Sequence, residues 1–296
     1  VSMLANNNKM IINKLAKNSV KSNKKQYGIL FFTIVLSAFM LFCVFTIGWT
    51  YLDSSRLQNT RLNGAEYDIT TMNGFTSKQV KSLQSNKNIQ NVGMESYAGF
   101  IKSSEFDNTV EIGLLWCDET FWNNLMSPAR TKLDGHYPQN KNELMVTKDI
   151  LKACGNENLS VGDSIVLTYE NNTGVHTDKF VISGIWDGYG DKSAGFVSKN
   201  FYDETGYDLK NDGILCIKLN RNYVLPTTIQ SLEKSLNFSD RQIFAPTDYI
   251  ENSFKLLLGI CGLALVICLS AYLLIYNILY LSISGKIRYY GLLQSL

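Results

Sequence analysis

Few residues of this 296-residue chain have the types and spacing that catalysis requires. His136 and His176 are the only histidines, and the sequence contains no HExxH, no paired CxxC and no GxxxxGK[ST]. Metal, thiol and nucleotide chemistry therefore lack their usual ligands.

The acidic pairs Asp118-Glu119 and Asp203-Glu204 are the remaining candidates, as acids of a hydrolase. Adjacent carboxylates on a polar surface are usually just solvated, so we interpret both pairs as surface residues. We expect no catalytic residue, no metal, no cofactor and no enzymatic activity in this chain.

The charges are segregated along the sequence. A total of 28 Lys+Arg against 26 Asp+Glu gives a net charge of +2, which excludes a basic nucleic-acid-binding arm or an acidic disordered tail. All acidic residues lie between Asp53 and Glu251, so both ends of the chain carry only basic side chains. This segregation is typical of a membrane protein.

Two long runs without charge support that interpretation. Residues 28–49 and 256–281 would span about 33 Å and 39 Å as helices, enough to cross a bilayer. Buried helices of a soluble protein are rarely apolar on every face, and a cleaved signal peptide has a shorter apolar region. We predict transmembrane helices over residues 28–51 and 253–283.

The basic residues set the expected orientation. Six lysines precede the first run, and Lys286 and Arg288 follow the second. By the positive-inside rule both ends are cytoplasmic, residues 52–252 are extracytoplasmic, and the chain belongs to the cell membrane. Residues 1–27 resemble a basic amphipathic helix on the inner membrane surface, or else a charged flank with accidental periodicity.

The extracytoplasmic cysteines do not predict a disulfide framework. Cys117, Cys154 and Cys216 are odd in number and widely spaced. The sequence leaves open whether two of them form a single disulfide bond.

The outer segment reads as an α+β domain of two lobes. Strand patterns at 66–72 and 92–102 flank a helix whose Thr76 and Gln79 fit a capping box. The same order recurs later, with strands at 213–219 and 242–245 around a helix whose apolar face carries Leu225, Ile229, Leu232 and Leu236. We predict a split ferredoxin-like lobe over about 62–102 plus 212–246.

The lobe inserted between them, about 103–211, is richer in strands. Strands are expected at 110–117, 143–147, 164–169, 179–186 and 195–198, short helices at 148–153 and 200–205, and a turn at 134–138. Pro246, Thr247 and Asp248 are expected to stop the last strand and cap a helix that continues into the second span.

Residues 284–296 carry an apolar stripe just inside the second span. Tyr289, Leu292, Leu293 and Leu296 recur at helical spacing. Such a stripe needs burial, either at the membrane interface or against a cytoplasmic partner.

Five short segments, in three parts of the sequence, resemble the FtsX/MacB-type permeases of ABC transporters. Residues 133–144 (LDGHYPQNKNEL) and 159–165 (LSVGDSI) are similar to the family's G-x-x-P…N-E-hydrophobic and hydrophobic-x-V-G-D segments. Residues 180–185 and 194–198 resemble paired strands of its extracytoplasmic core. Residues 287–296 (IRYYGLLQSL) resemble R-E-I-G-L-L-R-A-L-G after the second span, with Tyr289 and Tyr290 in place of Glu and Ile.

The resemblance implies a MacB-core-like domain between two spans, as in the N-terminal portion of such a permease, whose members continue into further spans. It implies a non-catalytic subunit that works with a separate cytoplasmic ATPase and with a second permease copy or half, in peptide or lipoprotein export or antimicrobial-peptide resistance. The residues that would couple to the ATPase are Arg288, Gly291, Leu292, Leu293 and Leu296.

Two other functions fit the topology. A two-span sensor would bind a ligand outside and transmit a movement through the helices, but it leaves the stripe of residues 289–296 unused. An extracytoplasmic enzyme tethered by two helices lacks a catalytic set.

Overall fold

A computed structural model describes residues 13–14, 17–18, 21, 23–102, 112–189 and 194–284. The chain divides into two compact units, Val1–Tyr51 with Leu256–Leu296, and Leu52–Lys255, which we call the membrane unit and the outer unit. The predicted segments 1–27 and 284–296 lie largely outside the described residues.

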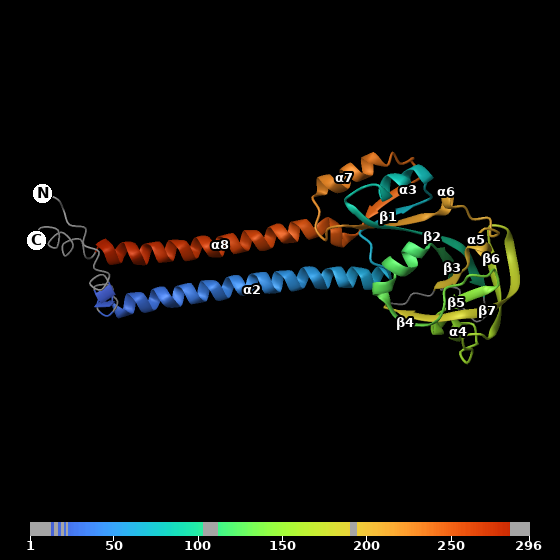
Figure 1. Cartoon of the computed structure of the whole chain (residues 1–296), viewed down its shortest axis with the longest axis horizontal. Coiled ribbons are helices and arrows are strands. Elements are labelled where there is room, and N and C mark those ends of the chain that lie inside the picture. Colours follow the sequence, from blue (N-terminus) through green and yellow to red (C-terminus); the bar gives the residue numbers. More distant parts are fainter. Residues whose placement is uncertain are drawn as a thin grey trace, which may run out of the picture. The chain divides into compact units, whose positions relative to one another are not determined.

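The membrane unit contains most of two long helices, α2 (Lys24–Asn63) and α8 (Asp248–Ser284) (Figure 1). Both are long and apolar enough to cross a membrane, which confirms the prediction of two apolar helices that flank a folded domain. Large side chains such as Phe31 and Phe42 are mostly exposed, so they need lipid or other protein around them. Gly48 lies against Ile260, where a Cβ would meet the isoleucine side chain at 2.7 Å.

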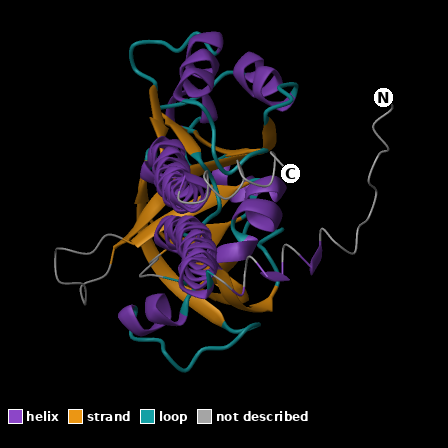
Figure 2. Cartoon of the chain, turned by 90° about the vertical axis from the view of Figure 1, so that its left-hand side faces the viewer, coloured by secondary structure: helices purple, strands orange, loops and turns teal. Residues whose placement is uncertain are grey.

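The outer unit is built on a ten-stranded sheet with the order β10-β1-β9-β2-β3-β8-β5-β7-β4, and β6 pairs with β2 and β7. Figure 2 shows these strands in orange with short helices around them. The strands are β1 (Ile69–Met72), β2 (Ile89–Lys102), β3 (Ile112–Cys117), β4 (Arg130–Gly135), β5 (Glu143–Val146), β6 (Ser164–Asn171), β7 (Gly174–Gly188), β8 (Ala194–Val197), β9 (Ile214–Leu219) and β10 (Ile243–Pro246).

The two predicted β-α-β units interlock in this sheet. Strand β9 lies between β1 and β2, which helix α3 (Ser77–Gln84) connects, and β1 lies between β9 and β10, which α7 (Pro226–Ser235) connects. This arrangement is the predicted split ferredoxin-like order. The remaining short helices are α4 (Lys148–Ala153), α5 (Lys199–Tyr202), α6 (Leu209–Asp212), a π-helical turn (Phe121–Leu125) and a 3-10 turn (Ser127–Ala129).

Local signals at the helix ends were largely correct. The capping box at α3 is confirmed, because Thr76 Oγ1 accepts from the Gln79 N–H and Gln79 Oε1 accepts from the Thr76 N–H. In α7, Ile229 and Leu232 are buried as predicted. The prediction was wrong for Leu225, which precedes the helix at its N-cap and is 51% exposed.

Three clusters of buried side chains hold the outer unit together. One contains Ile69, Leu83 and Ile217 of the β-α-β units, and a second contains Leu114, Phe180 and other residues of the strand-rich segment. The third, with Trp122 and Phe196, includes the π-helical turn. The boundaries of the two lobes stay a prediction.

The sequence patterns did not predict β4, α6 or the two helical turns at Phe121–Leu125 and Ser127–Ala129. The turn expected at 134–138 begins with the last residues of β4. This strand lies at the edge of the sheet, pairs with β7 and has mostly exposed side chains. Its sequence therefore lacks the alternating apolar pattern from which a strand is predicted. Strands β6 and β7 continue to a two-residue turn at Asn172 and Thr173, beyond the predicted strand ends. The six cysteines are all free.

Candidate functional site at the outer ends of the long helices

The structure does not bring the chemistry-bearing residues of the sequence into one site. The coupling residues Arg288, Gly291, Leu292, Leu293 and Leu296 lie outside the described residues. Among the described residues, no group of three or more His, Cys, Asp or Glu side chains is arranged to hold a metal ion.

The acidic pairs have structural contacts. Asp118 is half-buried and accepts from the backbone N–H groups of Met94 and Phe121, at 2.9 and 2.8 Å, so it caps the π-helical turn. Asp203 pairs with Lys199, and Glu204 lies 2.5 Å from Lys141, all on the surface as expected. The prediction that both pairs are surface residues was therefore wrong for Asp118, which is half-buried because its carboxylate binds these backbone N–H groups.

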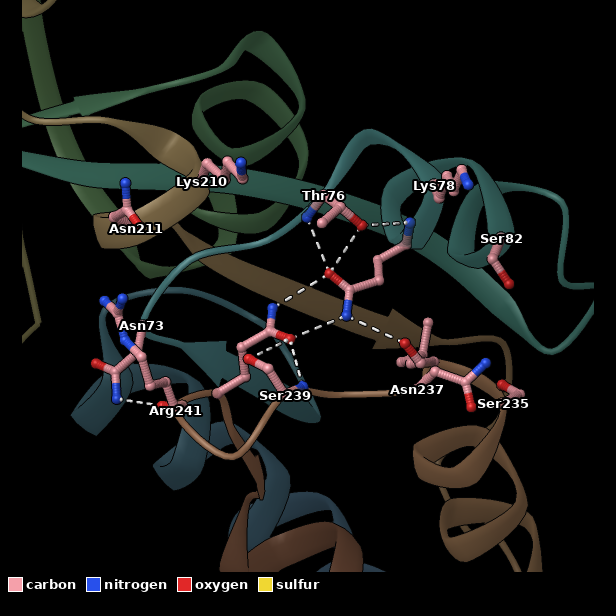
Figure 3. A pocket seen from close by; sticks show the side chains of 13 residues that line it. Asn73, Thr76, Lys78, Ser82, Lys210, Asn211, Ser235, Asn237, Ser239 and Arg241 are labelled. Atoms are coloured by element: carbon pink, nitrogen blue, oxygen red, sulfur yellow. Dashed lines mark hydrogen bonds between the residues drawn. The ribbon is translucent and has the colours of Figure 1, made fainter.

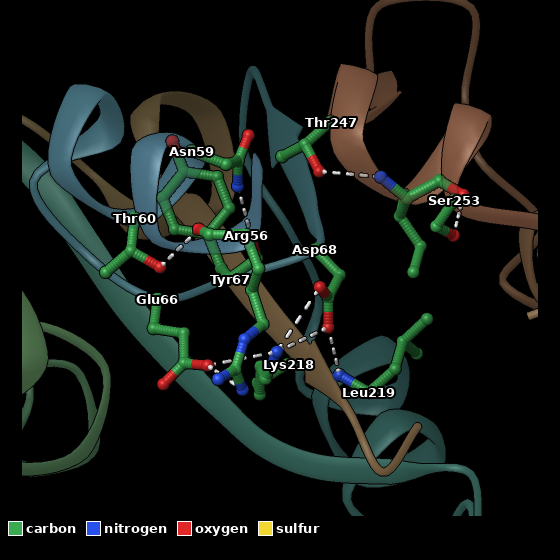
Figure 4. Close-up of polar contacts among 11 residues, drawn as sticks. Arg56, Asn59, Thr60, Glu66, Tyr67, Asp68, Lys218, Leu219, Thr247 and Ser253 are labelled. Atoms are coloured by element: carbon green, nitrogen blue, oxygen red, sulfur yellow. Dashed lines mark hydrogen bonds and ion pairs between the residues drawn. The ribbon is translucent and has the colours of Figure 1, made fainter. Parts of the chain in front are cut away.

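A polar cluster instead occupies the point where both long helices meet the sheet. Residues 52–63 of α2 and 248–255 of α8 belong to the outer unit, so this junction lies within one compact unit. Figure 4 shows its members around the end of β9. We call Arg56, Glu66, Asp68 and Lys218 the junction cluster.

Helix α2 is attached through its last three turns. Leu52 and Thr60 are buried, and Asn59 Nδ2 donates to the backbone carbonyl of Tyr67 at 3.4 Å. Arg56 lies 3.6 Å from a carboxylate oxygen of Glu66. The helix ends at Asn63 because Gly64 adopts φ +67°, a left-handed conformation that glycine accepts without strain.

Helix α8 is attached through its first turns. The Thr247 N–H donates to the backbone carbonyl of Asp68 at 2.8 Å, and Thr247 Oγ1 accepts from the Ile250 N–H at 3.5 Å. Threonine therefore caps this helix, where the sequence had suggested Asp248 as well. Ile250 and Ser253 on the following turn are fully buried.

Lys218 connects these attachments from an interior strand of the sheet. It stands on β9, is only 5% exposed, and its Nζ lies 3.3 Å from Glu66 and 3.3 Å from Asp68. Asp68 is 1% exposed and also accepts from the Leu219 N–H at 2.8 Å. A buried ammonium group of this kind requires partners, and the two carboxylates supply them.

The electrostatic balance at Asp68 is set by burial. Loss of water around the carboxyl raises the pKa of Asp68, although Lys218 and the Leu219 N–H stabilise its charged form and act in the opposite direction. The ion pair therefore depends on the geometry that keeps Lys218 close to it.

The junction cluster connects α2 and α8, which are far apart in sequence, to the neighbouring strands β1 and β9. Glu66 bridges Arg56 of α2 and Lys218 of β9, while Asp68 bridges Lys218 and the cap of α8. None of these contacts was predicted. The sequence did contain a signal, because Lys218 interrupts the apolar strand Ile-Leu-Cys-Ile-Lys-Leu and a charge in a buried strand needs a partner.

By sequence, the chain matches no protein-family model and none of the curated proteins. Among solved structures it is similar to the periplasmic region of MacB from Actinobacillus actinomycetemcomitans, with 15% identity and a TM-score of 0.43 over 66% of this chain and 95% of that one. It is also similar to the extracellular domain of the noncanonic ABC-type transporter YknZ from Gram-positive bacteria, with 10% identity and a TM-score of 0.39 over 60% of this chain and 98% of that one. At such identities the likeness concerns fold.

Proposed function

We propose that this chain is a membrane permease subunit of the FtsX/MacB type. A separate cytoplasmic ATPase hydrolyses ATP and moves the two long helices, and the outer domain moves with them. The transported class would be that of peptide or lipoprotein export or antimicrobial-peptide resistance. The start of α2 at Lys24 and the end of α8 at Ser284 would then both be cytoplasmic.

The observation that carries this proposal is the junction cluster. A movement of α2 reaches Glu66 through Arg56, and a movement of α8 reaches Asp68 through the Thr247 N–H. Both carboxylates contact the same buried Lys218, so neither helix end can shift without disturbing β9. The Lys218–Asp68 pair is almost completely buried, and a buried, hydrogen-bonded ion pair is rigid enough to pass on such a displacement.

The family-like segments 133–144 and 159–165 support the proposal because residues in both have a defined structural role. Gly135 ends β4 at φ +88°, and Glu143 begins β5 while its carboxylate accepts from the Gln139 and Asn140 N–H groups at 2.7 and 3.1 Å. Gly162, at φ +96°, leads into β6, and its N–H donates to Ile182 of β7 at 2.8 Å. These residues define the turns around β7, so the resemblance extends to positions that the backbone requires.

Complex formation with an ATPase tests the proposal. The full reading frame would be co-expressed with the ATPase encoded beside it, and the complex purified from membranes through a tag on this chain. We expect a stable complex that Leu292→Asp combined with Leu293→Asp weakens at least about tenfold, because a charge on the apolar stripe cannot be buried in the partner. Leu225→Asp, at an exposed leucine of the outer unit, is the matched control.

Two outcomes would contradict the permease function. One is recovery of an undiminished complex from the doubly substituted chain. The other is a chain that binds no ATPase while an extracytoplasmic ligand changes the activity of a kinase encoded beside it, which would favour the two-span sensor.

A further inference from the structure

A polar pocket of about 560 Å³ lies on the outer unit (Figure 3), and no residue of the junction cluster lines it. Its walls come from the start of α3, the segment that follows α7, and α6. The volume is in the range of small-molecule sites, which run from about 300 to 1,000 Å³. Nothing in the permease function uses it.

The charges that line this pocket are all positive. Lys78, Lys210 and Arg241 contribute side chains, and no carboxylate is among the lining residues. In the part of the chain that the structure describes, none of these three cations forms an ion pair. The outer unit holds all 26 acidic residues of the chain, so a pocket without any of them is a local exception.

The base of the pocket is held by two side-chain amides. Gln79 and Gln242 donate to each other at 3.2 Å, Gln79 Nε2 also donates to the Leu236 carbonyl at 3.1 Å, and Gln242 Nε2 donates to the Gly74 carbonyl at 2.7 Å. Gln79 itself is 93% buried, since its exposed fraction is 7%. The amides therefore fix three separate segments of the chain relative to one another before any ligand binds.

Two left-handed asparagines shape the backbone around the pocket. Asn73 and Asn237 have φ values of 65° and 44°, and among the described residues they are the only non-glycine residues with positive φ. Both line the pocket, and Asn73 Nδ2 donates to the Arg241 carbonyl at 2.8 Å. Asparagine accepts this left-handed conformation more readily than other non-glycine residues, and Asn237 directly follows the C-cap of α7, where such a residue commonly ends a helix.

The backbone of Lys210 is fixed by close contact with Gly74. A Cβ on Gly74 would lie 2.0 Å from the Lys210 carbonyl oxygen, so the backbone of α6 packs directly on the segment before α3. The Gly74 N–H also donates to Gly213 at 2.9 Å. All three cations thus line one cavity, and the backbone that carries Lys210 is fixed against the segment before α3.

We propose that this pocket binds a phosphate group of an extracytoplasmic ligand. Cations and side-chain amide and hydroxyl donors that line one cavity are the groups that recognise phosphate oxygens. Asn211, Ser82 and Ser239 also line the cavity and supply polar contacts for the hydroxyls of a phosphorylated sugar or glycerol. The inference does not depend on the permease function.

Titration calorimetry on the full chain in neutral detergent micelles tests this site. The probes are inorganic pyrophosphate, glycerol 3-phosphate, and soluble short-chain phosphatidic acid, with short-chain phosphatidylcholine as the lipid without a free phosphate monoester. We expect saturable binding of at least one of the first three, weakened by added salt because the attraction is between charges. Preference for pyrophosphate or glycerol 3-phosphate indicates a soluble ligand, and preference for phosphatidic acid indicates a lipid headgroup.

Matched variants identify the pocket. Lys78→Gln combined with Arg241→Gln should weaken binding at least about tenfold, because two charge-assisted contacts are removed. Lys81→Gln changes the same helix outside the pocket and should leave the affinity unchanged. All these side chains are exposed, so the variants should unfold at the same temperature as the unaltered chain. The absence of saturable binding by every phosphate probe, or equal affinities of the double variant and Lys81→Gln, would overturn the proposal.

Discussion

The Nζ atom of Lys218 lies 3.3 Å from a carboxylate oxygen of Asp68, and both side chains are almost completely buried. The two residues are 150 positions apart, yet they meet where β9 passes the start of β1. Because Asp68 also accepts the Thr247 N–H that precedes α8, this one pair lies beside the attachment of a long helix.

Removal of the buried cation should be costly. In Lys218→Met, Glu66 and Asp68 lose their shared partner and Asp68 stays buried, so we expect a loss of about 3–5 kcal/mol in the free energy of unfolding. Guanidinium unfolding of the full chain in detergent, followed by tryptophan fluorescence, measures it. A loss below about 1 kcal/mol would contradict the central position that we assign to Lys218.

Arg56 should behave differently, because its ion pair with Glu66 is partly exposed. The side chains of Arg56 and Glu66 are 36% and 25% exposed, and Arg56 also lies 3.5 Å from Asp53. We expect Arg56→Gln to change the unfolding free energy by no more than about 1 kcal/mol in the same assay. A loss as large as that of Lys218→Met would mean that the α2 attachment is energetically inseparable from the buried pair.

Two glycines of the family-like segments should differ in how they tolerate alanine. At Gly135 a Cβ would lie 2.2 Å from the Ser183 carbonyl oxygen, whereas at Gly162 nothing lies within 4 Å. Gly162→Ala therefore carries only the left-handed backbone penalty of about 1–2 kcal/mol. Gly135→Ala adds a backbone clash and should therefore destabilise the outer unit considerably more than Gly162→Ala does. The unfolding midpoints of the two variants measure this difference. Equal midpoints would show that the chain around Ser183 can move away.

Glu143 should make the stability depend on acidic pH. Slight burial raises the pKa of this carboxyl, but the Gln139 and Asn140 N–H groups and the Asn140 side-chain amide outweigh it and lower the pKa overall. Such a group stabilises the fold above the unfolded glutamate pKa, about 4.3, and this contribution disappears as the pH falls through the lower native value.

The variant Glu143→Gln tests that dependence. We expect it to be less stable than the unaltered chain at pH 7, with a difference that disappears below about pH 4. Glu233→Gln, at an exposed position on α7, is the control. A difference that stays constant from pH 7 to pH 3 would mean that Glu143 acts through packing and not through its charge.

The membrane orientation can be read by cysteine labelling in intact cells. In a chain whose six cysteines are replaced by alanine, a membrane-impermeant maleimide should label Lys234→Cys on α7 and should miss Lys24→Cys at the start of α2. The positive-inside rule gives this orientation. Labelling of position 24 without position 234 would reverse it.

The sequence by itself determined the features that depend on local pattern and composition. Continuous apolar runs predicted α2 and α8, and the spacing of Thr76 and Gln79 predicted the start of α3. Capping and a continuous apolar run are decided within a few residues or within one helix. The order of strands and helices also predicted the two β-α-β units. The exposed edge strand β4 escaped prediction, since a strand that buries neither face leaves no alternating pattern.

The tertiary structure alone decided which distant residues meet. Only the interlocked order β10-β1-β9-β2 places Lys218 beside Glu66 and Asp68, and only the packing of α6 against Gly74 places Lys210 in the same cavity as Lys78 and Arg241. A charge in a sequence carries no information about its partner until the chain has folded, because the energy of an ion pair depends on separation and burial in space.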